Sequence, residues 1–265
     1  MRPETLNILC SPAEKLPLKI VNECYNGNRA QFLVNDEHNL RFPIRDGIPV
    51  FVEKDHLMGL NRRYRTIYDS FASVYDFISR VGLFMMGLSE DNIRGVFREE
   101  LEVREGARVL ETSVGTGSNL THLPQGCLCY GFDLSWNMLK RCEKKLEKMG
   151  IVADLFLGEA EHLPFKDDVF DVVYQMGGIN FFNDKAQAIK EMVRVTRGGT
   201  RIVIMDETEK VARTLERFPG ISVFFKDRQE AISPPVESIP AGMEDIKIKE
   251  LFKGQAWLLS FRKPS

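Results

Sequence analysis

Short apolar runs alternate with longer segments of helical spacing through the middle of the chain. The apolar runs have lengths typical of buried parallel strands and fall at 107–110, 128–133, 151–157, 170–176 and 201–206. Between them, segments 136–149 and 184–196 predict helices, the first with Ser135 in the capping position. This alternation predicts an α/β fold around a mostly parallel sheet.

The beginning of the chain has a different pattern. Its β-like runs are short, are separated by Pro, Asn-Gly and Asn-Asp turn signals, and fall at 6–10, 18–21, 30–34 and 48–51. We therefore predict two domains, a small antiparallel β module over residues 1–53 and a larger domain over residues 54–265.

Helical spacing characterises the segment 57–101. Apolar residues recur at steps of three and four within 64–81, namely Ile67, Phe71, Val74, Tyr75 and Ile78. Ser89, followed by Glu90 and Asp91, predicts the start of another helix that ends near Leu101.

The last part of the chain closes the sheet. A helix is predicted at 207–217, and the Pro-containing segment 221–242 is irregular and could cover a substrate. The segments 246–252 and 256–261, separated by Lys-Gly-Gln, predict a terminal antiparallel hairpin.

Composition and charge narrow the function classes. The apolar fraction of 43% and the charged fraction of 28% are ordinary for a soluble protein. A net charge of -2 gives no reason to expect a nucleic-acid partner. The longest apolar run, 81–88, is too short to span a bilayer, and the N-terminus has no signal pattern. Five cysteines without a disulfide-like layout fit a reducing compartment, so we expect a cytoplasmic protein. The sequence does not determine the oligomeric state.

A glycine-bearing loop follows the first apolar run of the larger domain. Residues 109–117 read V-L-E-T-S-V-G-T-G, and the next apolar run ends in Asp133. If both runs are parallel strands, Glu111, the Gly115/Gly117 loop and Asp133 surround one crevice at the sheet edge. Glycines permit a sharp turn and close approach of a ligand, and a helix starting near Ser118 would direct amides at the loop. Asp133 could accept both hydroxyls of a ribose.

Two details distinguish between a dinucleotide and S-adenosylmethionine as the ligand of this crevice. The third glycine of the dinucleotide fingerprint is absent, because Leu120 occupies its place. Glu111 would repel a pyrophosphate but suits the ammonium of a methionine moiety. The stretch resembles motif I of the class I S-adenosylmethionine-dependent methyltransferases, E/D-x-G-x-G-x-G, with Ser113 in the place of the first glycine.

Three further stretches extend this resemblance over roughly residues 60–265. Residues 158–171, G-E-A-E-H-L-P-F-K-D-D-V-F-D, resemble the family's G-D-A-x-x-L-P-F-x-D-x-x-F-D block, and residues 194–200 resemble its R-V-L-K-P-G-G turn. Residues 68–76, Y-D-S-F-A-S-V-Y-D, resemble a helix of the ubiquinone/menaquinone methyltransferases that packs over cofactor and substrate. The resemblance implies a Rossmann-like, seven-stranded, mostly parallel sheet with an antiparallel last strand.

The N-terminal module resembles the Trm112-like, zinc-ribbon-like modules of some methyltransferases. The resemblance lies in F-P-I-R-D-G-I-P-V-F at 42–51. Such modules hold zinc through Cys-x-x-Cys pairs, but here Cys10 lacks its partner and Cys24 stands alone. Two cysteines do not complete a tetrahedral site, so we expect no bound metal.

The resemblance implies an enzyme that uses S-adenosylmethionine to methylate a small-molecule acceptor, for example an apolar or quinone-like one. Glu111 would organise the methionine end, Asp133 the ribose, and Glu159 with Ala160 the adenine. The full expected cofactor set is Tyr75, Glu111, Thr112, Ser113, Gly115, Gly117, Asp133, Leu134, Glu159, Ala160 and Gln175. No catalytic base is assigned; Tyr75, Asn180 and Asp206 are candidates by position alone. The alternatives are an RNA or protein methyltransferase, a non-catalytic module that binds S-adenosylmethionine, and a nicotinamide oxidoreductase.

Overall fold

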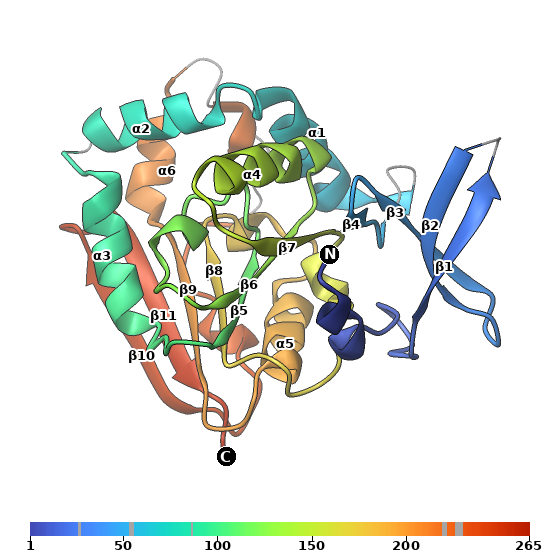
Figure 1. The fold of residues 1–265 in the computed structure, drawn as a ribbon. Helices are drawn as coiled ribbons and strands as arrows, with labels where there is room; N and C mark the ends of the chain where they lie inside the picture. Colours follow the sequence, from blue (N-terminus) through green and yellow to red (C-terminus); the bar gives the residue numbers. More distant parts are fainter. Residues whose placement is uncertain (26–27, 53–55, 86, 219–221, 226–229) are drawn as a thin grey trace.

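The computed structural model describes residues 1–25, 28–52, 56–85, 87–218, 222–225 and 230–265. Within these residues the central sheet has seven strands in the order β10-β11-β9-β8-β5-β6-β7 (Figure 1). Its strands are β5 (Arg108–Thr112), β6 (Leu128–Asp133), β7 (Ala153–Leu157), β8 (Val172–Met176), β9 (Arg201–Glu207), β10 (Glu244–Leu251) and β11 (Ala256–Arg262). Strands β5 to β9 are parallel to one another, and β11 pairs antiparallel with both β9 and β10. The predicted fold class is confirmed.

Helices pack on both faces of this sheet because its strands alternate buried side chains between two cores. On β6, Tyr130 and Phe132 join a core with Ile189 of α5, whereas Cys129 joins a core with Leu139 of α4. The helices are α1 (Gly59–Phe71), α2 (Tyr75–Met85), α3 (Glu90–Glu100), α4 (Trp136–Lys148), α5 (Lys185–Val195) and α6 (Glu209–Leu215).

Several predicted helix starts are confirmed by capping hydrogen bonds. The Ser135 hydroxyl accepts from the Met138 amide, and the Asp184 carboxylate accepts from the Gln187 amide. Ser89 caps α3 by accepting from the Asn92 amide at 3.1 Å.

Two helix predictions were wrong. The helix expected near Ser118 is only a 3₁₀ turn, Leu120–His122, and Pro124 follows immediately, which prevents its extension. Within the described segment 113–126, no helix N-terminus therefore directs a ladder of amides at the glycine loop. The segment 64–81 is not one helix but parts of α1 and α2, which are separated by a turn at 72–74.

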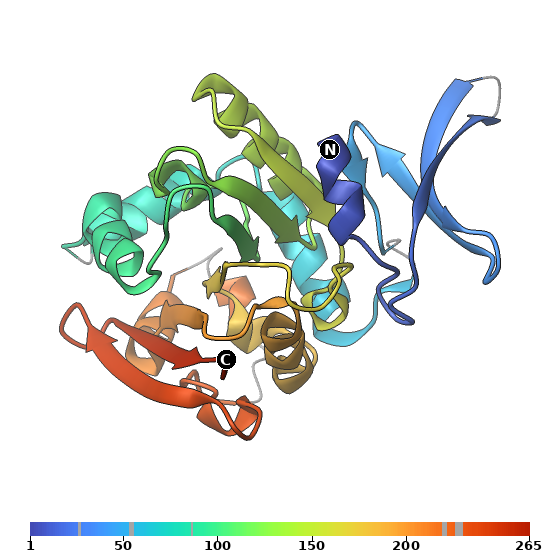
Figure 2. The same ribbon diagram turned by 60° about the horizontal axis from the view of Figure 1, so that its bottom comes forward.

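The N-terminal residues form a second, four-stranded antiparallel sheet. Its strands are β1 (Lys19–Tyr25), β2 (Asn28–Asn35), β3 (Leu40–Arg45) and β4 (Ile48–Pro49). The strand expected at 6–10 is instead mostly a 3₁₀ helix, Pro3–Ile8, because Pro3 sets the backbone for a helical first turn. Figures 1 and 2 place this sheet and the β10–β11 hairpin at opposite ends of the molecule.

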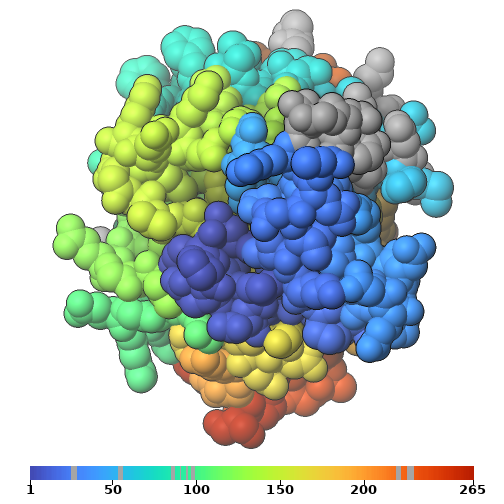
Figure 3. Space-filling view, turned by 45° about the vertical axis from the view of Figure 1, so that its right-hand side comes forward, coloured from blue at the N-terminus to red at the C-terminus, as the bar shows by residue number. Residues whose placement is uncertain are grey.

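The N-terminal sheet is packed into the larger domain rather than suspended from it. Arg2 donates from its amide and its Nε to the buried carboxylate of Asp154 at 2.8 and 2.9 Å, and the Thr5 hydroxyl donates to the same group. The Phe51 amide donates to the Leu157 carbonyl at 2.8 Å, which extends the central sheet beyond β7. Figure 3 shows the blue N-terminal residues as a continuous surface against the yellow-green atoms of the larger domain. The boundary predicted at residue 53 lies outside the described residues and stays a prediction.

Two further features of the described segments concern membrane-spanning helices and metal-binding groups of side chains. Among those residues, none of the helices has both the length and the apolar character needed to cross a bilayer. The same part of the chain contains no group of three or more His, Cys, Asp and Glu side chains that could hold a metal ion. Cys10 is buried and Cys24 is exposed on β1.

Candidate active site

The two predicted acids lie at the same edge of the sheet. In the parallel register of β5 and β6, Glu111 pairs with Gly131 and Thr112 with Phe132, so both strands end together. The loops that follow, including Ser113 to Ser118 after β5, therefore begin side by side at the carboxyl ends of the strands. This is the edge at which open α/β sheets bind their ligands.

The backbone of the glycine loop is held in a left-handed conformation next to Asp133. Ser113 has a φ of 60° and Gly115 a φ of 53°. The serine therefore adopts a conformation that favours glycine, and it lines the cavity described below without closing it. A Cβ at Gly115 would meet no atom within 4 Å, because this residue opens onto the same cavity.

Asp133 is oriented by backbone amides on either side of it. Its Oδ2 accepts from the Gly115 amide at 2.7 Å, and its Oδ1 accepts from the Ser135 amide at 2.8 Å. Burial raises the pKa of Asp133 to about 6, against the lowering effect of these hydrogen bonds, and the nearby Asp69 raises it further. The carboxylate therefore ionises fully only near neutral pH, when it becomes a strong acceptor for ligand hydroxyls.

Glu111 and Gly117 lie behind the cavity surface. The Glu111 side chain is fully buried and accepts from Asn119 Nδ2 at 2.5 Å and from the Tyr174 hydroxyl at 3.0 Å. A Cβ at Gly117 would come within 2.5 Å of the Cys142 Sγ, so this glycine lets the loop pack closely on α4. Both residues support the loop in this structure, and the contact predicted between Glu111 and the methionine end stays a prediction.

A cavity of about 980 Å³ opens at this sheet edge. Its volume is at the upper end of the roughly 300–1,000 Å³ range of small-molecule sites. Of the predicted cofactor residues, those that line it are Tyr75, Ser113, Gly115, Asp133 and Leu134. Those that do not are Glu111, Thr112, Gly117, Glu159, Ala160 and Gln175. The cavity therefore extends well beyond the residues that sequence motifs assign to the cofactor.

Gln175 and Thr112 are fully buried, next in sequence to residues that line the cavity. The Gln175 side chain donates to the Gly177 carbonyl and so supports the Gly177–Gly178 turn that lines the cavity. The Thr112 hydroxyl lies 3.4 Å from the Tyr174 carbonyl. Each of these side chains supports a neighbouring strand end, and their predicted contact with the cofactor stays a prediction.

Two aspartates fasten α1 and α2 over the sheet edge. Asp69 of α1 accepts from the Ser135 hydroxyl at 2.5 Å and from the Asn137 amide at 3.1 Å. Asp76 of α2 accepts from the Thr116 hydroxyl at 2.6 Å, and its Oδ2 lies 2.9 Å from Lys145 Nζ. Burial acts to raise the pKa of Asp76, but hydrogen bonds from Thr116 and Lys145 outweigh it and lower this pKa. Both helices are thus tied to the loops that flank Asp133.

The predicted adenine end is connected to α1 by Asn61. The Asn61 Nδ2 donates to Glu159 Oε1 at 2.7 Å and to Glu161 Oε1 at 3.1 Å. Burial raises the pKa of Glu161, and Glu159 raises it further. Ala160 is buried at the start of the short turn between these two acids. Asn61 lines the cavity, so it stands between the bulk of the cavity and Glu159.

Arg65 contributes a buried positive charge to the same wall. Its side chain is 9% exposed, and its Nε lies 3.7 Å from Asp69 Oδ2. In the part of the chain that the structure describes, its Nε and Nη1 have no hydrogen-bond partner. Because Arg65 lines the cavity, these groups could donate to a bound ligand.

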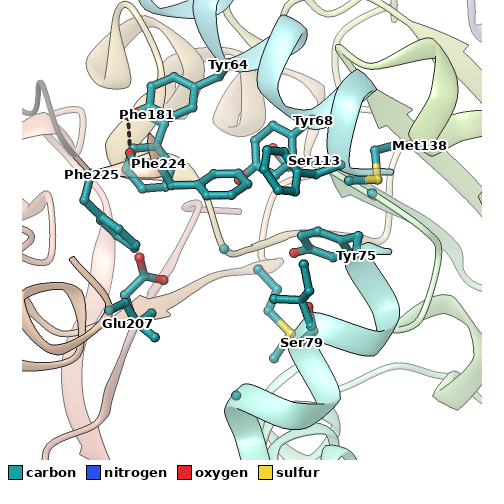
Figure 4. A pocket seen from close by; sticks show the side chains of 18 of the residues that line it. Tyr64, Tyr68, Tyr75, Ser79, Ser113, Met138, Phe181, Glu207, Phe224 and Phe225 are labelled. Atoms are coloured by element: carbon teal, nitrogen blue, oxygen red, sulfur yellow. Dashed lines mark hydrogen bonds between the residues drawn. The ribbon is translucent and has the colours of Figure 1, made fainter. Parts of the chain in front are cut away.

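The rest of the cavity wall is aromatic. Tyr64 stacks on Phe181 with ring centroids 4.5 Å apart, and its hydroxyl donates to the Phe224 carbonyl at 2.7 Å. The Tyr68 ring lies 5.4 Å from Phe224 and 6.1 Å from Tyr75 between centroids. Figure 4 shows these rings gathered around the hollow. Such a wall accommodates a flat apolar molecule through burial and ring stacking.

One acid faces this aromatic part of the cavity. Glu207, the last residue of β9, lines it and lies across the hollow from Tyr75 in Figure 4. Burial raises the pKa of Tyr75 to about 12, so its hydroxyl keeps its proton at neutral pH. Asp206 is only 4% exposed and accepts from the Gly178 amide and from Asn180 Nδ2 at 3.2 and 3.1 Å. Among the described carboxylates that line the cavity, Glu207 is therefore the one placed to take a proton from a ligand in the aromatic part.

Sequence reasoning missed Glu207, Asn61 and the two aspartates of α1 and α2. Only the aspartates had a signal, since Tyr68-Asp69 and Tyr75-Asp76 repeat the same pair seven residues apart. In each pair the tyrosine lines the cavity and the aspartate holds a neighbouring loop. Glu207 had been placed at the start of a helix, although it belongs to the end of β9.

The donor set of the cavity fits S-adenosylmethionine. Asp133 presents a carboxylate suited to ribose hydroxyls, Gly115 leaves open space beside it, and Leu134 and Met138 add apolar surface. Residues 110–204 match the methyltransferase domain family, and residues 2–47 match the Trm112p-like protein family.

Individual proteins agree with these family matches. The chain is 28% identical over 208 residues to demethylmenaquinone methyltransferase of Mycobacterium marinum, covering 74% of this chain and 85% of that protein. A solved S-adenosylmethionine-dependent methyltransferase of Thermotoga maritima has the same fold, with a TM-score of 0.56, 22% identity and coverage of 75% and 98% of the two chains. A chain in the complex between the Haloferax volcanii Trm112 methyltransferase activator and a methyltransferase has a TM-score of 0.55 at 18% identity, covering 75% and 98%. The protein is thus a class I S-adenosylmethionine-dependent methyltransferase that carries a Trm112-like module at its N-terminus.

Proposed function

We propose that this enzyme methylates an apolar aromatic small molecule of the quinol type. The observation that carries the proposal is the aromatic wall of the cavity beyond Asp133, formed by α1, α2 and the segments at 181–182 and 224–225. The similarity to a demethylmenaquinone methyltransferase supports the same class of acceptor.

Within this proposal the cavity has two ends with different tasks. Asp133 accepts the ribose hydroxyls of S-adenosylmethionine, while Glu159 and Ala160 meet the adenine. S-adenosylmethionine, once bound, supplies an electrophilic methyl group on a sulfonium. Tyr64, Tyr68 and Phe224 hold the acceptor and exclude water. They thereby align the acceptor with the methyl group, and alignment is the main contribution that such a reaction needs from the protein.

Glu207 acts as the general base of the proposed reaction. A hydroxylated aromatic acceptor loses one proton as its oxygen or ring carbon gains the methyl group, and the Glu207 carboxylate takes that proton. Tyr75, which stays protonated, can donate a hydrogen bond to an acceptor oxygen.

The test is transfer of a labelled methyl group from S-adenosylmethionine to a reduced naphthoquinone with an unsubstituted ring carbon. We expect an extractable methylated product, and for Glu207→Gln we expect kcat to fall on the order of 10²- to 10⁴-fold. The KM for S-adenosylmethionine should not change, since Glu207 lies away from Asp133. A Glu207→Gln variant with wild-type kcat would remove Glu207 from the reaction.

One observation favours a macromolecular acceptor as the second candidate. The N-terminal module matches the Trm112p-like family, and a similar structure is a complex with a Trm112 methyltransferase activator. The same labelling assay includes bulk RNA and protein as acceptors. Label in either fraction, with none in the naphthoquinol, would replace the small-molecule proposal by this second one. Such a result would also favour a protein partner for the module.

A further inference from the structure

Helix α2 exposes a row of large apolar side chains on one face. Phe77, Val81 and Phe84 are spaced at i, i+4 and i+7, and their side chains are 70%, 40% and 83% exposed. This spacing places them along a single stripe of the helix. Val74, just before the helix, is 44% exposed and continues the stripe by one turn. Scattered exposed apolar residues are ordinary, but a contiguous stripe of this kind marks an interaction surface.

The stripe is continuous with the active-site cavity. Phe77 and Val81 both line the cavity while their outer surfaces remain exposed. Phe218, which follows α6, also lines the cavity and is 39% exposed. Apolar side chains of α2 therefore contribute both to the outer surface of this helix and to the cavity that the aromatic wall lines.

Basic side chains border this apolar rim. Lys210, Arg213 and Arg217 are exposed, and their spacing of three and four residues places them on one face of α6 and the turn after it. Lys210 also lines the cavity, and Arg213 is 71% exposed while paired with Glu209. Figure 1 shows α6 below α2, and residues of both helices line the cavity. The rim thus combines an apolar stripe that could contact acyl chains with a row of basic side chains that could contact anionic headgroups.

We propose that α2 and the basic face of α6 dock the enzyme on the surface of an anionic phospholipid bilayer. The phenylalanines of the stripe insert among the acyl chains near the headgroups, and the basic row contacts the phosphates. In this position the mouth of the cavity faces the bilayer, so an apolar acceptor can enter without crossing water. The proposal concerns membrane binding itself and does not depend on which acceptor the enzyme methylates.

The test is cosedimentation of the full chain with phospholipid vesicles. We expect wild-type protein to bind vesicles of phosphatidylcholine with phosphatidylglycerol and to bind pure phosphatidylcholine vesicles much more weakly. Phe84→Ser should weaken binding about ten-fold, because one phenylalanine leaves the apolar phase. Phe84 does not line the cavity, so the affinity for S-adenosylmethionine should remain that of the wild type. Arg213→Gln with Arg217→Gln should weaken binding to the anionic vesicles and reduce its dependence on salt.

The matched control is Met149→Ser with Val152→Ser. These side chains are 55% and 67% exposed after α4, outside the cavity, and their replacement should leave vesicle binding unchanged. Equal binding by wild type and Phe84→Ser would overturn the proposal, as would wild-type binding that does not respond to anionic lipid. Light scattering tests whether a second copy of the chain, rather than a membrane, covers the stripe. A wild-type dimer that Phe84→Ser converts into monomers would assign the stripe to a second copy of the chain and overturn the membrane assignment.

Discussion

The Asp133 carboxylate is under two opposing influences. Burial favours its protonated form and raises its pKa to about 6, whereas amide hydrogen bonds from Gly115 and Ser135 favour the charged form. Hydroxyls that donate to the carboxylate would favour the charged form further, so the pKa should be lower in the complex than in the free enzyme.

This difference predicts how cofactor affinity depends on pH. Affinity for S-adenosylmethionine should be constant above a pH of about 6 and should fall as the pH drops below it, because the free enzyme then binds a proton that the complex releases. Calorimetric titration from neutral to acidic pH measures this. Asp133→Asn should bind about ten-fold more weakly at neutral pH, with little change between neutral and acidic pH. A pH-dependent fall of equal size in Asp133→Asn would assign the titration to another group.

Some residues of the site could be predicted from the sequence and others could not. Gly115 and Asp133 were predictable because a parallel strand end and a turn leave them few alternatives, and both line the cavity. Glu111 belongs to the same motif, yet its carboxylate is engaged with Asn119 and Tyr174, and no sequence spacing reports such a contact. Glu207 was missed because its position depends on one additional residue at the end of β9.

The α1–α2 pair acts as a cover that is held by a small number of polar contacts. Asp76 connects α2 to Thr116 and Lys145, and its lowered pKa keeps it charged at neutral pH. Its contribution to stability is present above the pKa of the unfolded chain and is lost as the pH falls through the lower pKa of the folded state.

Asp76→Asn should loosen α2 without unfolding the sheet. Loss of a hydrogen bond to a charged group corresponds to about 1.5–3 kcal/mol, so cofactor affinity should fall on the order of ten-fold. Hydrogen exchange should become faster in α2 and remain unchanged in β5 and β6. Asp91→Asn is the control, since the Asp91 side chain is 92% exposed on the neighbouring helix. Unchanged exchange in α2 would show that Asp76 does not hold this helix in place.

At the level of elements, periodicity predicted the strands of the central sheet and helices α3, α4 and α5 well. The helix expected near Ser118 is only the short turn Leu120–His122, because Pro124 leaves no room for a longer one. Periodicity failed to separate α1 from α2, because Ala72 and Val74 continue the apolar spacing across the break.

On the scale of the whole molecule, the N-terminal sheet and the larger domain share one core. Ile8, Leu9 and Leu33 are buried together with Phe165 of the larger domain. A part-buried ion pair also joins the two parts, since Lys15 Nζ lies 2.7 Å from Glu191 Oε2. Long-range contacts of this kind leave no local sequence pattern, and the composition of residues 1–53 alone suggested a separate module.

Asp154→Ala tests whether the two parts unfold together. Asp154 is 3% exposed and holds Arg2 and Thr5, so its loss should reduce the free energy of unfolding by about 3 kcal/mol. Urea denaturation should shift as a single transition, with amides of β2 and of β6 losing protection together. Asp36→Ala removes an exposed pair with Lys19 and should have little effect. Loss of protection in β2 alone would show that the N-terminal sheet unfolds independently.

The two edges of the central sheet are protected in different ways. The outer strand β10 is exposed and reads E-D-I-K-I-K-E-L, so charged side chains discourage another chain from pairing with it. The opposite edge, β7, has no such charges in its sequence A-D-L-F-L beyond Asp154, and it is covered by Val50 and Phe51. The N-terminal segment thus protects this edge against aggregation. An enzyme shortened to its catalytic part would expose β7 as an unpaired edge strand with which another protein chain could pair.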